Sequence, residues 1–413
     1  MSNTVKLGEE VLINPESVSK NYPYDEIEYI DISSVGSGTF EGARTVPIKD
    51  APSRAKRLVK NGDTIISTVR PNRRSFLYIK NPKSNTVVST GFAVLRAKDN
   101  IDERYLYFMI NYQAFTDYLT NRAKGAAYPA VDTEIISNAK IPLPPLSTQK
   151  NIASILSAYD DLIENNTRRI QILEEMAQRI YKEWFVDFKY PGYEDDQMID
   201  SELGKIPDGW EVLPLNEIID IKSGFAFKSS SFESDGSYGL VTIKNVQDGI
   251  FITKCQNHLN ETPDKMPEYC ILRGGDIILS LTGNVGRVCL VHGEKYLLNQ
   301  RVAKLIPNNI ADRAFVYSLF RNNAFRTILE MISTGTAQQN LSPILMGKYS
   351  IIVPHRNVLS LFSDLCNPIL DEILLLYMKN KTLRHTRDLL LPKLISGKVD
   401  VSDLDIDTSI LHD

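Results

Sequence analysis

The sequence repeats itself, and this duplication restricts the possible folds more than any other feature. When the 413-residue chain is aligned with itself at a shift of about 210 residues, matches recur along most of its length. Residues 28–40 align with residues 239–251, and from Asp102 and Asp312 onward the shift stays at 210. Self-similarity on this scale indicates a tandem duplication, so we expect two copies of one structural unit.

Each copy begins with a mixed α/β part. Short runs rich in β-branched residues, such as residues 86–95, predict strands, and residues 102–124 and 312–334 predict helices. We therefore expect an α+β fold with two related α/β domains. The expected divisions are residues 1–145 for the first domain, 146–200 for a central helical region, 201–355 for the second domain, 356–403 for a C-terminal helical region and 404–413 for an acidic tail.

Each copy then continues into a long helical pattern. Ser147 follows a proline-rich stretch and is expected to be the N-cap of the first helix. Pro368 and Pro392 should kink or divide the second helix. Apolar residues with spacings of three and four predict a heptad seam. The expected seam positions are Ile152, Ile155, Tyr159, Leu162, Asn166, Ile170, Leu173, Ala177, Ile180 and Trp184 in the first helix, and Phe362, Leu365, Ile369, Ile373, Leu376, Leu383, Leu390 and Leu394 in the second.

Apolar stripes of this kind usually mean ordinary core packing, and here the core would be formed by the two helices themselves. The chain order is domain, helix, domain, helix, so the second helix should return along the first as its antiparallel partner. The expected picture is a dumbbell with a pseudo-two-fold axis. The outer faces of the helices should then form a long polar surface, with Arg168, Arg169, Glu174 and Glu175 among its residues.

Local charge points to nucleic acid, although the net charge of the chain is −4. Residues 51–98 contain eleven Lys and Arg residues and one acid, Asp63. A basic segment of this kind is typical of a phosphate-binding surface, and a merely solvated face is the alternative. Within it, the loop 68–75 carries three Arg residues, whose forked donors can grip a phosphate or read guanine bidentately.

The aligned loops of the two copies differ in sequence, which is what domains with different targets would show. Residues 68–75 align with residues 281–288, and residues 124–131 align with residues 334–341. Asn in such a loop can read adenine bidentately. The predicted DNA-binding residues are Lys56, Arg57, Lys60, Arg70, Arg73, Arg74, Lys124, Tyr128, Lys244, Asn284, Arg287, Arg301, Gln338, Gln339 and Asn340.

Sequence signals for catalysis, metal binding and membrane insertion are weak or missing. There is no Walker loop or dinucleotide fingerprint, and the five His and four Cys residues lack metal-ligand spacing. Asp208, Asp220 and Lys222 match the spacing of a metal-dependent nuclease site, but so bare a match arises often by chance. No apolar run is long enough to span a bilayer, and we expect a cytoplasmic protein without a catalytic or metal site.

Three segments resemble the specificity subunit of type I restriction-modification systems. They are PLPPLSTQKNIASILSAYDDLIENNTRRIQILEEMAQRIYKEWFVDF (142–188), LGKIPDGWEVLPLNEI (203–218) and RDLLLPKLISGKV (387–399). The resemblance implies that each globular part is a target recognition domain for half of a bipartite double-stranded DNA sequence. It also implies that the helices space the two halves.

The same resemblance implies partners and cofactors. Two methyltransferase subunits would dock on the helices and methylate adenine N6 with S-adenosylmethionine. Restriction subunits would join through them as ATP-driven, Mg-dependent motors that cut DNA. No cofactor is expected in this chain.

Two other functions compete with a non-catalytic specificity subunit. One is a self-contained restriction or methyltransferase enzyme with fused recognition domains, which the missing catalytic motifs disfavour. The other is a coiled-coil assembly adaptor that never contacts DNA, which the basic segment 51–98 disfavours.

Overall fold

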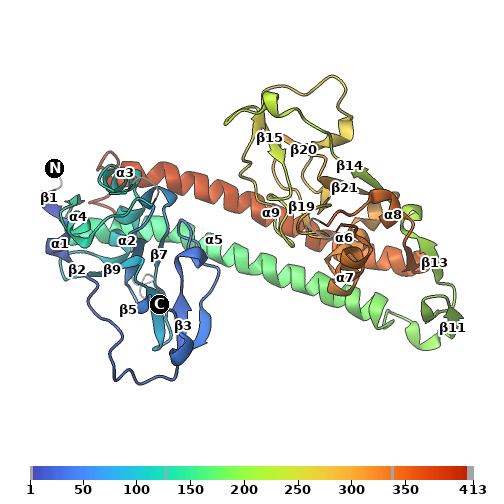
Figure 1. The fold of residues 1–413 in the computed structure, drawn as a ribbon, viewed down its shortest axis with the longest axis horizontal. Helices are drawn as coiled ribbons and strands as arrows, with labels where there is room; N and C mark the ends of the chain where they lie inside the picture. The colour runs from blue at the N-terminus through green and yellow to red at the C-terminus, as the bar shows by residue number, and fades with distance from the viewer. Residues whose placement is uncertain (1–2, 126–127, 336–338, 407–413) are drawn as a thin grey trace. The chain divides into compact units, whose positions relative to one another are not determined.

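The chain folds as two compact units, each of which combines a globular part with portions of two long helices. Unit 1 comprises residues 1–163 and 383–413, and unit 2 comprises residues 164–382. The structure is a computed structural model that describes residues 3–125, 128–335 and 339–406 (Figure 1).

Two four-stranded sheets and a two-stranded sheet form the β-structure of unit 1. The first sheet has the order β2 (Val11–Ile13), β9 (Phe92–Ala97), β6 (Thr64–Ser67) and β7 (Phe76–Tyr78). The second has the order β4 (Arg44–Pro47), β3 (Glu26–Ile30), β8 (Thr86–Ser89) and β5 (Ala55–Leu58), and the short sheet pairs β1 (Asn3–Lys6) with β10 (Lys140–Leu143). All four residues of β6 are buried, and three of them, Thr64, Ile65 and Ile66, are β-branched.

Unit 2 repeats this topology strand for strand. Its first sheet has the order β14 (Ile219–Ser223), β21 (Val302–Pro307), β18 (Ile277–Ser280) and β19 (Val288–Leu290). Its second has the order β16 (His258–Leu259), β15 (Tyr238–Val241), β20 (Tyr296–Leu298) and β17 (Ile271–Leu272), and β13 (Glu211–Pro214) pairs with β22 (Ser350–Val353). The parallel strand pairing recurs as well, as β3 with β8 and as β15 with β20. The duplication predicted from the sequence is confirmed in the fold.

Short helices complete each globular part. Unit 1 has α1 (Leu7–Glu10), α2 (Glu103–Asn111), α3 (Gln113–Thr120) and α4 (Thr133–Ser137). Unit 2 has α6 (Arg313–Arg321), α7 (Asn323–Ile332) and α8 (Pro343–Gly347), together with a hairpin of β11 (Met198–Ser201) and β12 (Gly204–Pro207). The Asp102 carboxylate caps α2 by accepting hydrogen bonds from the backbone N–H groups of Arg104 and Tyr105. The aligned Asp312 instead pairs with Arg356 at 2.7 Å.

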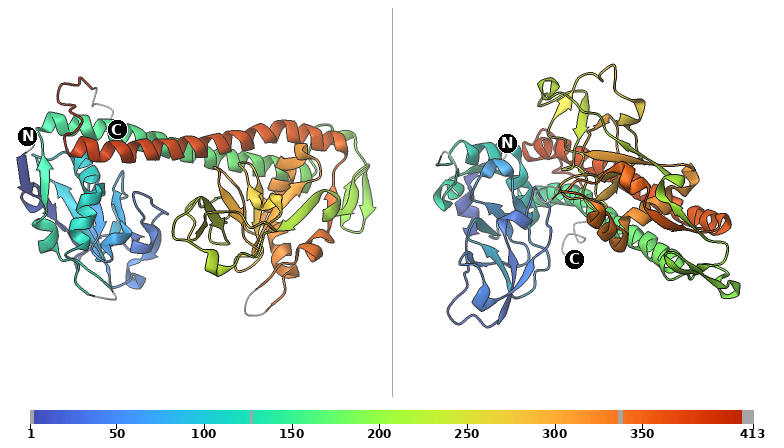
Figure 2. Two further views of the ribbon diagram at one scale, coloured as in Figure 1. Left: turned by 90° about the horizontal axis from the view of Figure 1, so that it is seen from above. Right: turned by 45° about the vertical axis from the view of Figure 1, so that its right-hand side comes forward.

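The two long helices, α5 (Leu146–Tyr181) and α9 (Arg356–Ile395), run in opposite directions beside each other (Figures 1 and 2). In unit 1 Arg387 of α9 pairs with Asp160 of α5. In unit 2 the buried amide of Asn166 donates a hydrogen bond of 2.9 Å to the side-chain oxygen of Asn380. The expected α+β class, with two related domains and a pair of antiparallel helices, is therefore confirmed.

The seam of each helix differs from the expected one at a single position. Leu162 and Leu365 are 51% and 47% exposed, whereas their neighbours Ile163 and Cys366 are buried. Residues spaced by seven on α5 that are all buried are Gln149, Leu156, Ile163, Ile170 and Ala177. The residues aligned with them at the shift of 210 on α9, which are buried or partly buried, are Leu359, Cys366, Ile373, Asn380 and Arg387. The repeat therefore continues through the two helices. The prediction failed locally because Leu162 and Leu365 are as apolar as the neighbouring residues that are buried.

Two further expectations about the helices are wrong. Helix α5 begins at Leu146, so Ser147 lies inside its first turn and is not the N-cap. Helix α9 runs without a break through Pro368 and Pro392. Pro368 and Asp364 are both exposed, so water can solvate the carbonyl group of Asp364 that loses its amide donor.

Other sequence expectations concern cysteines and membrane spans. All four cysteines are free and buried. Within residues 3–125, 128–335 and 339–406, no helix combines the length and hydrophobicity that crossing a bilayer requires.

Candidate nucleic-acid interface

Three loops that are far apart in the sequence meet in unit 1. The backbone N–H of Arg70 donates to the carbonyl oxygen of Pro129 at 2.6 Å, which joins the loop 68–75 to the loop 124–131. The N–H of Gly38 donates to the carbonyl oxygen of Phe76 at 3.1 Å, which adds the turn 35–40. We call the described residues of these three segments the first loop cluster.

Unit 2 contains the same arrangement, built from the aligned segments. The N–H of Leu341 donates to the carbonyl oxygen of Leu281 at 2.8 Å, and the N–H of Gly249 donates to that of Val288 at 2.8 Å. These bonds join the turn 246–251 and the loops 281–288 and 334–341, whose described residues we call the second loop cluster. The loops predicted to contact DNA are thus brought together in each unit.

The first loop cluster presents a strained and basic loop. Arg70 and Arg74 flank a 3-10 turn (Pro71–Arg73) and adopt positive φ angles of 48° and 57°, which L-residues rarely do. Backbone strain of this kind tends to gather at functional sites. The Arg70 guanidinium lies over the half-exposed ring of Tyr128, 4.7 Å from its centroid. Stacking of this kind fixes the direction of a long side chain before any ligand binds.

Arg73 and Arg74 have different surroundings. The guanidinium of Arg74 donates to the side-chain oxygen of Gln113 at 2.7 Å and to the backbone and side-chain oxygens of Asn111, each at 2.6 Å. Arg73 is exposed, and its side chain has no ion pair or hydrogen bond within the described residues. Arg74 therefore ties the loop to helices α2 and α3, and Arg73 is left as the donor that can reach a base or a phosphate.

We expect Arg73→Ala and Arg74→Ala to have separable effects. Removing Arg73 should relax discrimination at one DNA half-site by about 1–3 kcal/mol, the usual value of a bidentate base contact. Removing Arg74 should lower the stability of unit 1 by roughly 1–3 kcal/mol, because it leaves buried acceptors unpaired. Binding competition with base-substituted duplexes and chemical denaturation distinguish the two. Equal effects of both variants on discrimination and on stability would contradict this division.

The basic segment does not form one continuous surface. Arg96 donates from Nε to Asp63 at 2.8 Å and also pairs with Glu16, so its charge is neutralised within the domain. Lys56 and Arg57 lie on β5, an edge strand of the second sheet. Burial lowers the pKa of the half-buried Arg57. Of this basic segment, only part is therefore available to phosphates.

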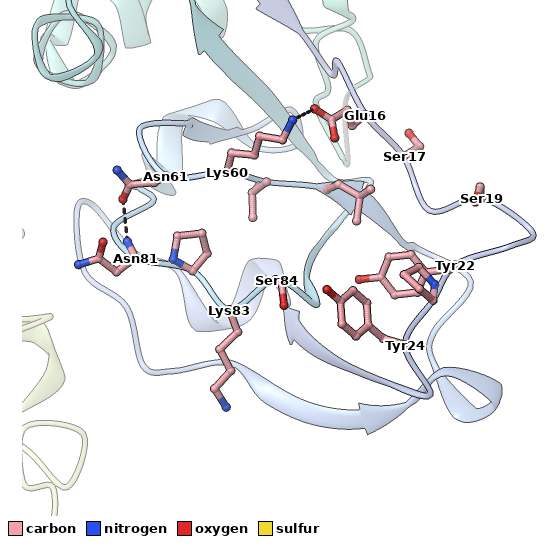
Figure 3. A pocket seen from close by; sticks show the side chains of 14 residues that line it. Glu16, Ser17, Ser19, Tyr22, Tyr24, Lys60, Asn61, Asn81, Lys83 and Ser84 are labelled. Atoms are coloured by element: carbon pink, nitrogen blue, oxygen red, sulfur yellow. Dashed lines mark hydrogen bonds and ion pairs between the residues drawn. The ribbon is translucent and has the colours of Figure 1, made fainter.

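Lys60 lies at a pocket of about 750 Å³ and not in the loop cluster (Figure 3). It pairs with Glu16 at 2.5 Å across the wall of this pocket, which Tyr22, Tyr24 and Lys83 also line. Strands β3 and β6 both run from the pocket end of unit 1 toward the loop cluster. Lys60 therefore belongs to the other end of these strands, and its predicted DNA contact remains a prediction.

The second loop cluster presents amides where the first presents guanidinium groups. Asn284, Gln339 and Asn340 are exposed in its loops. Arg287 donates to the side-chain oxygen of Gln247, which ties the loop 281–288 to the turn 246–251. Among the other predicted residues, Arg301 and Lys124 are exposed, Lys244 donates to Gln256 at 2.9 Å, and Gln338 lies outside the described residues.

One group of residues beside this cluster was not predicted as part of the site. Asp248 in the turn 246–251 pairs with Arg321 at 2.5 Å, and Arg321 also lies 3.4 Å from Glu174 of helix α5. Glu174 was expected on the polar outer face of the helix, but its side chain is only 12% exposed. The sequence signal that could have revealed these residues is the alignment of Gly249 with Gly38. Both glycines lie in turns that pack against a helix, Gly38 against Tyr107 of α2 and Gly249 against Arg321 of α6.

No metal centre is apparent in the part of the chain that the structure describes, where no group of three or more His, Cys, Asp or Glu residues could hold an ion. Asp220 and Lys222, from the nuclease-like spacing, form an exposed ion pair of 2.8 Å on β14.

Comparisons with known proteins agree with a duplicated DNA-reading architecture. The family model for the type I restriction modification DNA specificity domain matches residues 3–175 and 207–358, and each range contains one loop cluster. The chain is 25% identical over 439 residues to the type I restriction enzyme HindI specificity subunit of Haemophilus influenzae, covering 91% of this chain and 95% of that relative. It is 27% identical over 383 residues to the MjaIX specificity subunit of Methanocaldococcus jannaschii, covering 91% and 85%. The type I S subunit from M. genitalium, at 16% identity, shares its fold with a TM-score of 0.55 over 96% of each chain.

Proposed function

Because the chain belongs to the type I restriction-modification specificity family, we propose that each of its loop clusters reads one half of a bipartite DNA sequence. The chain is a specificity subunit with two DNA specificity domains. The observation that carries the proposal is the duplicated loop cluster. The same sheet order supports loops that present Arg70 and Arg73 in one unit and Asn284 and Asn340 in the other. Arg favours guanine and Asn favours adenine in the major groove, so two such loops suit two different half-sites.

We further propose that the chemistry resides in partner subunits that join this chain in the cytoplasm. Methyltransferase subunits would supply adenine N6 methylation with S-adenosylmethionine, and restriction subunits would supply Mg-dependent and ATP-driven cleavage. The chain itself would bind none of these cofactors. The polar groups of its loop clusters suit base recognition, since amides and guanidinium groups supply directed hydrogen bonds to base edges.

The long helices offer a surface on which such partners could dock. In unit 2 the side chains of Leu361, Leu365 and Leu375 on α9 are 51%, 47% and 47% exposed. At about 100° per residue they fall within one arc of roughly 80° on the helix. Ile172 and Met176 of α5 are 48% and 45% exposed. Apolar side chains grouped on one face typically mark a protein interface. The duplication supplies two long helices related by the shift of 210, so we propose two methyltransferase subunits per chain.

The docking face can be tested without touching the loop clusters. We expect the double variant Leu365→Glu and Leu375→Glu to weaken methyltransferase binding at least tenfold, because each carboxylate would have to be desolvated in an apolar interface. Ser234→Glu with Ser237→Glu is the matched control, since it adds the same charge at exposed loop positions. Titration of the methyltransferase followed by native mass determination measures affinity and stoichiometry together. An unchanged affinity in the leucine variant would contradict docking on α9, and one methyltransferase at saturation would contradict the count of two.

The proposal that catalysis lies elsewhere has a direct test. The purified chain is incubated with DNA, S-adenosylmethionine and Mg, with and without the methyltransferase. We expect methyl transfer to adenine only when both proteins are present, and no cutting by the chain alone. Methyl transfer or cutting by the chain alone would instead identify a self-contained enzyme. A chain that fails to bind duplex DNA even with its methyltransferase would favour a pure assembly adaptor.

A further inference from the structure

A buried group of charges links helix α5 to the DNA-facing turn of unit 2. The Tyr317 hydroxyl donates to Oε1 of Glu174 at 2.7 Å, and Nε of Arg321 lies 3.4 Å from Oε2 of the same carboxylate. The side chains of Glu174 and Arg321 are 12% and 16% exposed. Burial raises the pKa of the Glu174 carboxyl although Arg321 opposes the rise. A carboxylate desolvated to this degree depends strongly on its cation, and the cation depends on it in turn.

The other side of Arg321 contacts the turn itself. Its Nη1 lies 2.5 Å from the carboxylate of Asp248, and Arg326 approaches the same carboxylate at 3.6 Å. Gly249 has a positive φ of 76°, and a Cβ atom built there would lie 2.8 Å from Nη2 of Arg321. The guanidinium is therefore packed against the backbone of the turn as well as paired with its carboxylate. Its position fixes the turn in two ways.

Unit 1 anchors its loop cluster at the aligned place with different chemistry. Gly38 aligns with Gly249, and a Cβ atom there would lie 2.7 Å from the hydroxyl of Tyr107, the residue aligned with Tyr317. Asn111 aligns with Arg321 and accepts from Arg74 of the loop 68–75. The C-terminal residue of the aligned helices, Asn111 of α2 and Arg321 of α6, thus contacts a segment of the loop cluster in each unit. In unit 2 the connection continues to helix α5 through the hydrogen bond from Tyr317 and the ion pair of Arg321, which both contact Glu174. In unit 1 the aligned Tyr107 lies in the field of the pair formed by Asp160 and Arg387 of the long helices.

We propose that Arg321 is a positioning residue for sequence reading by the second loop cluster, and that Glu174 of helix α5 holds it in place. This inference rests on the proposed DNA-reading function. Ion pairs between buried partners have a narrow geometry, so a displaced Arg321 would displace Asp248 and the turn 246–251. The loop 281–288 would be displaced with the turn, because its Arg287 donates a hydrogen bond to Gln247 in the turn. Helix α5 therefore sets where the second domain presents its base contacts.

The test compares discrimination at the two half-sites in the complex of the full chain with its methyltransferase. Three duplexes are used: the recognised sequence, one altered in the half-site of unit 1 and one altered in the half-site of unit 2. For Arg321→Met and Asp248→Asn we expect discrimination at the second half-site to fall about fivefold to 100-fold, the range that one well-placed base contact contributes. Discrimination at the first half-site should stay as in the parent chain.

Two milder variants separate positioning from folding. Glu174→Gln keeps an acceptor for Tyr317 but removes the charge opposite Arg321, so it should lower second-site discrimination in the same direction. Glu175→Gln is the matched control, because this neighbour on α5 is exposed, and it should change nothing. Arg321→Lys keeps the charge without the fork and should restore part of the discrimination lost in Arg321→Met. If Arg321→Met does not fold, Glu174→Gln and Arg321→Lys decide the question alone.

The outcomes are distinguishable from failure of the proposed function. Loss of thermal stability in Glu174→Gln with unchanged second-site discrimination would overturn the inference and leave a structural ion pair. Equal loss at both half-sites would overturn it as well, because it would show a general effect on the complex. A parent complex that discriminates at neither half-site would instead refute the proposed function.

Discussion

Exchanging residues 1–145 for the same part of a related specificity subunit is expected to replace one half of the recognised DNA sequence and to leave the other half unchanged. The whole first loop cluster lies between residues 35 and 131, so the exchange transfers it intact. The junction follows β10, which keeps the pairing of β1 with β10 inside the exchanged part. It also precedes Leu146, where helix α5 begins, so the helical seam is not altered. Mapping methylated adenines in cells that contain the chimera and the methyltransferase measures the outcome.

The matched control for this exchange is the reciprocal chimera. Exchanging residues 210–353, which contain β13, β22 and the second loop cluster between them, should replace only the other half of the sequence. A chimera that alters both half-sites would show that the two domains read DNA as one unit. That result would contradict independent reading by two loop clusters.

Lengthening both long helices by one heptad is the second change with a large expected effect. Seven residues extend a helix by about 10 Å, which is roughly three base pairs of duplex DNA. Three base pairs also turn a half-site by roughly 100° about the DNA axis. The variant should therefore either recognise a spacer longer by a few base pairs or lose specific binding. Methylated-site mapping distinguishes these results from an unchanged spacer.

The contacts between α5 and α9 show where the insertions should be placed. Inserting after Thr167 in α5 and after Leu376 in α9 leaves Asn166 opposite Asn380 on one side. It leaves Arg169 opposite Glu372, at 2.8 Å, on the other. A four-residue insertion at the same points is the control, because it breaks the heptad register and should destabilise the helix pair. An unchanged spacer with full affinity in the heptad variant would show that the helices do not set the distance between half-sites.

The fold could be predicted as far as the duplication extends. Aligned residues such as Gly38 and Gly249 occupy equivalent turns, and the loops aligned at residues 68–75 and 281–288 both join a loop cluster. The sheet orders could not be read from the sequence, because they depend on pairings between strands far apart in the chain. The helical seam was displaced at Leu162 and Leu365 because apolarity alone does not show which of two neighbouring residues the partner helix covers.

The candidate site could be predicted at the level of loops but not of single side chains. Residue type marks Arg73 and Arg74 as candidate donors to DNA. Only tertiary contacts show that the guanidinium of Arg74 already donates to Asn111 and Gln113. Glu174 has the sequence context of a surface residue, and its burial depends on Tyr317 and Arg321 from a distant helix. The sequence therefore could not show that Glu174 is paired with Arg321 and not exposed to solvent.

We propose that this chain supplies the sequence specificity of a methyltransferase that lacks it alone. The most direct measurement is a genome-wide map of methylated adenines in cells that contain the methyltransferase with this chain, without it, or with the residue 1–145 chimera. The predicted result is a bipartite motif that appears only when the chain is present and changes in one half with the chimera. The same motif without the chain, or a motif unaffected by the exchange, would contradict the claim.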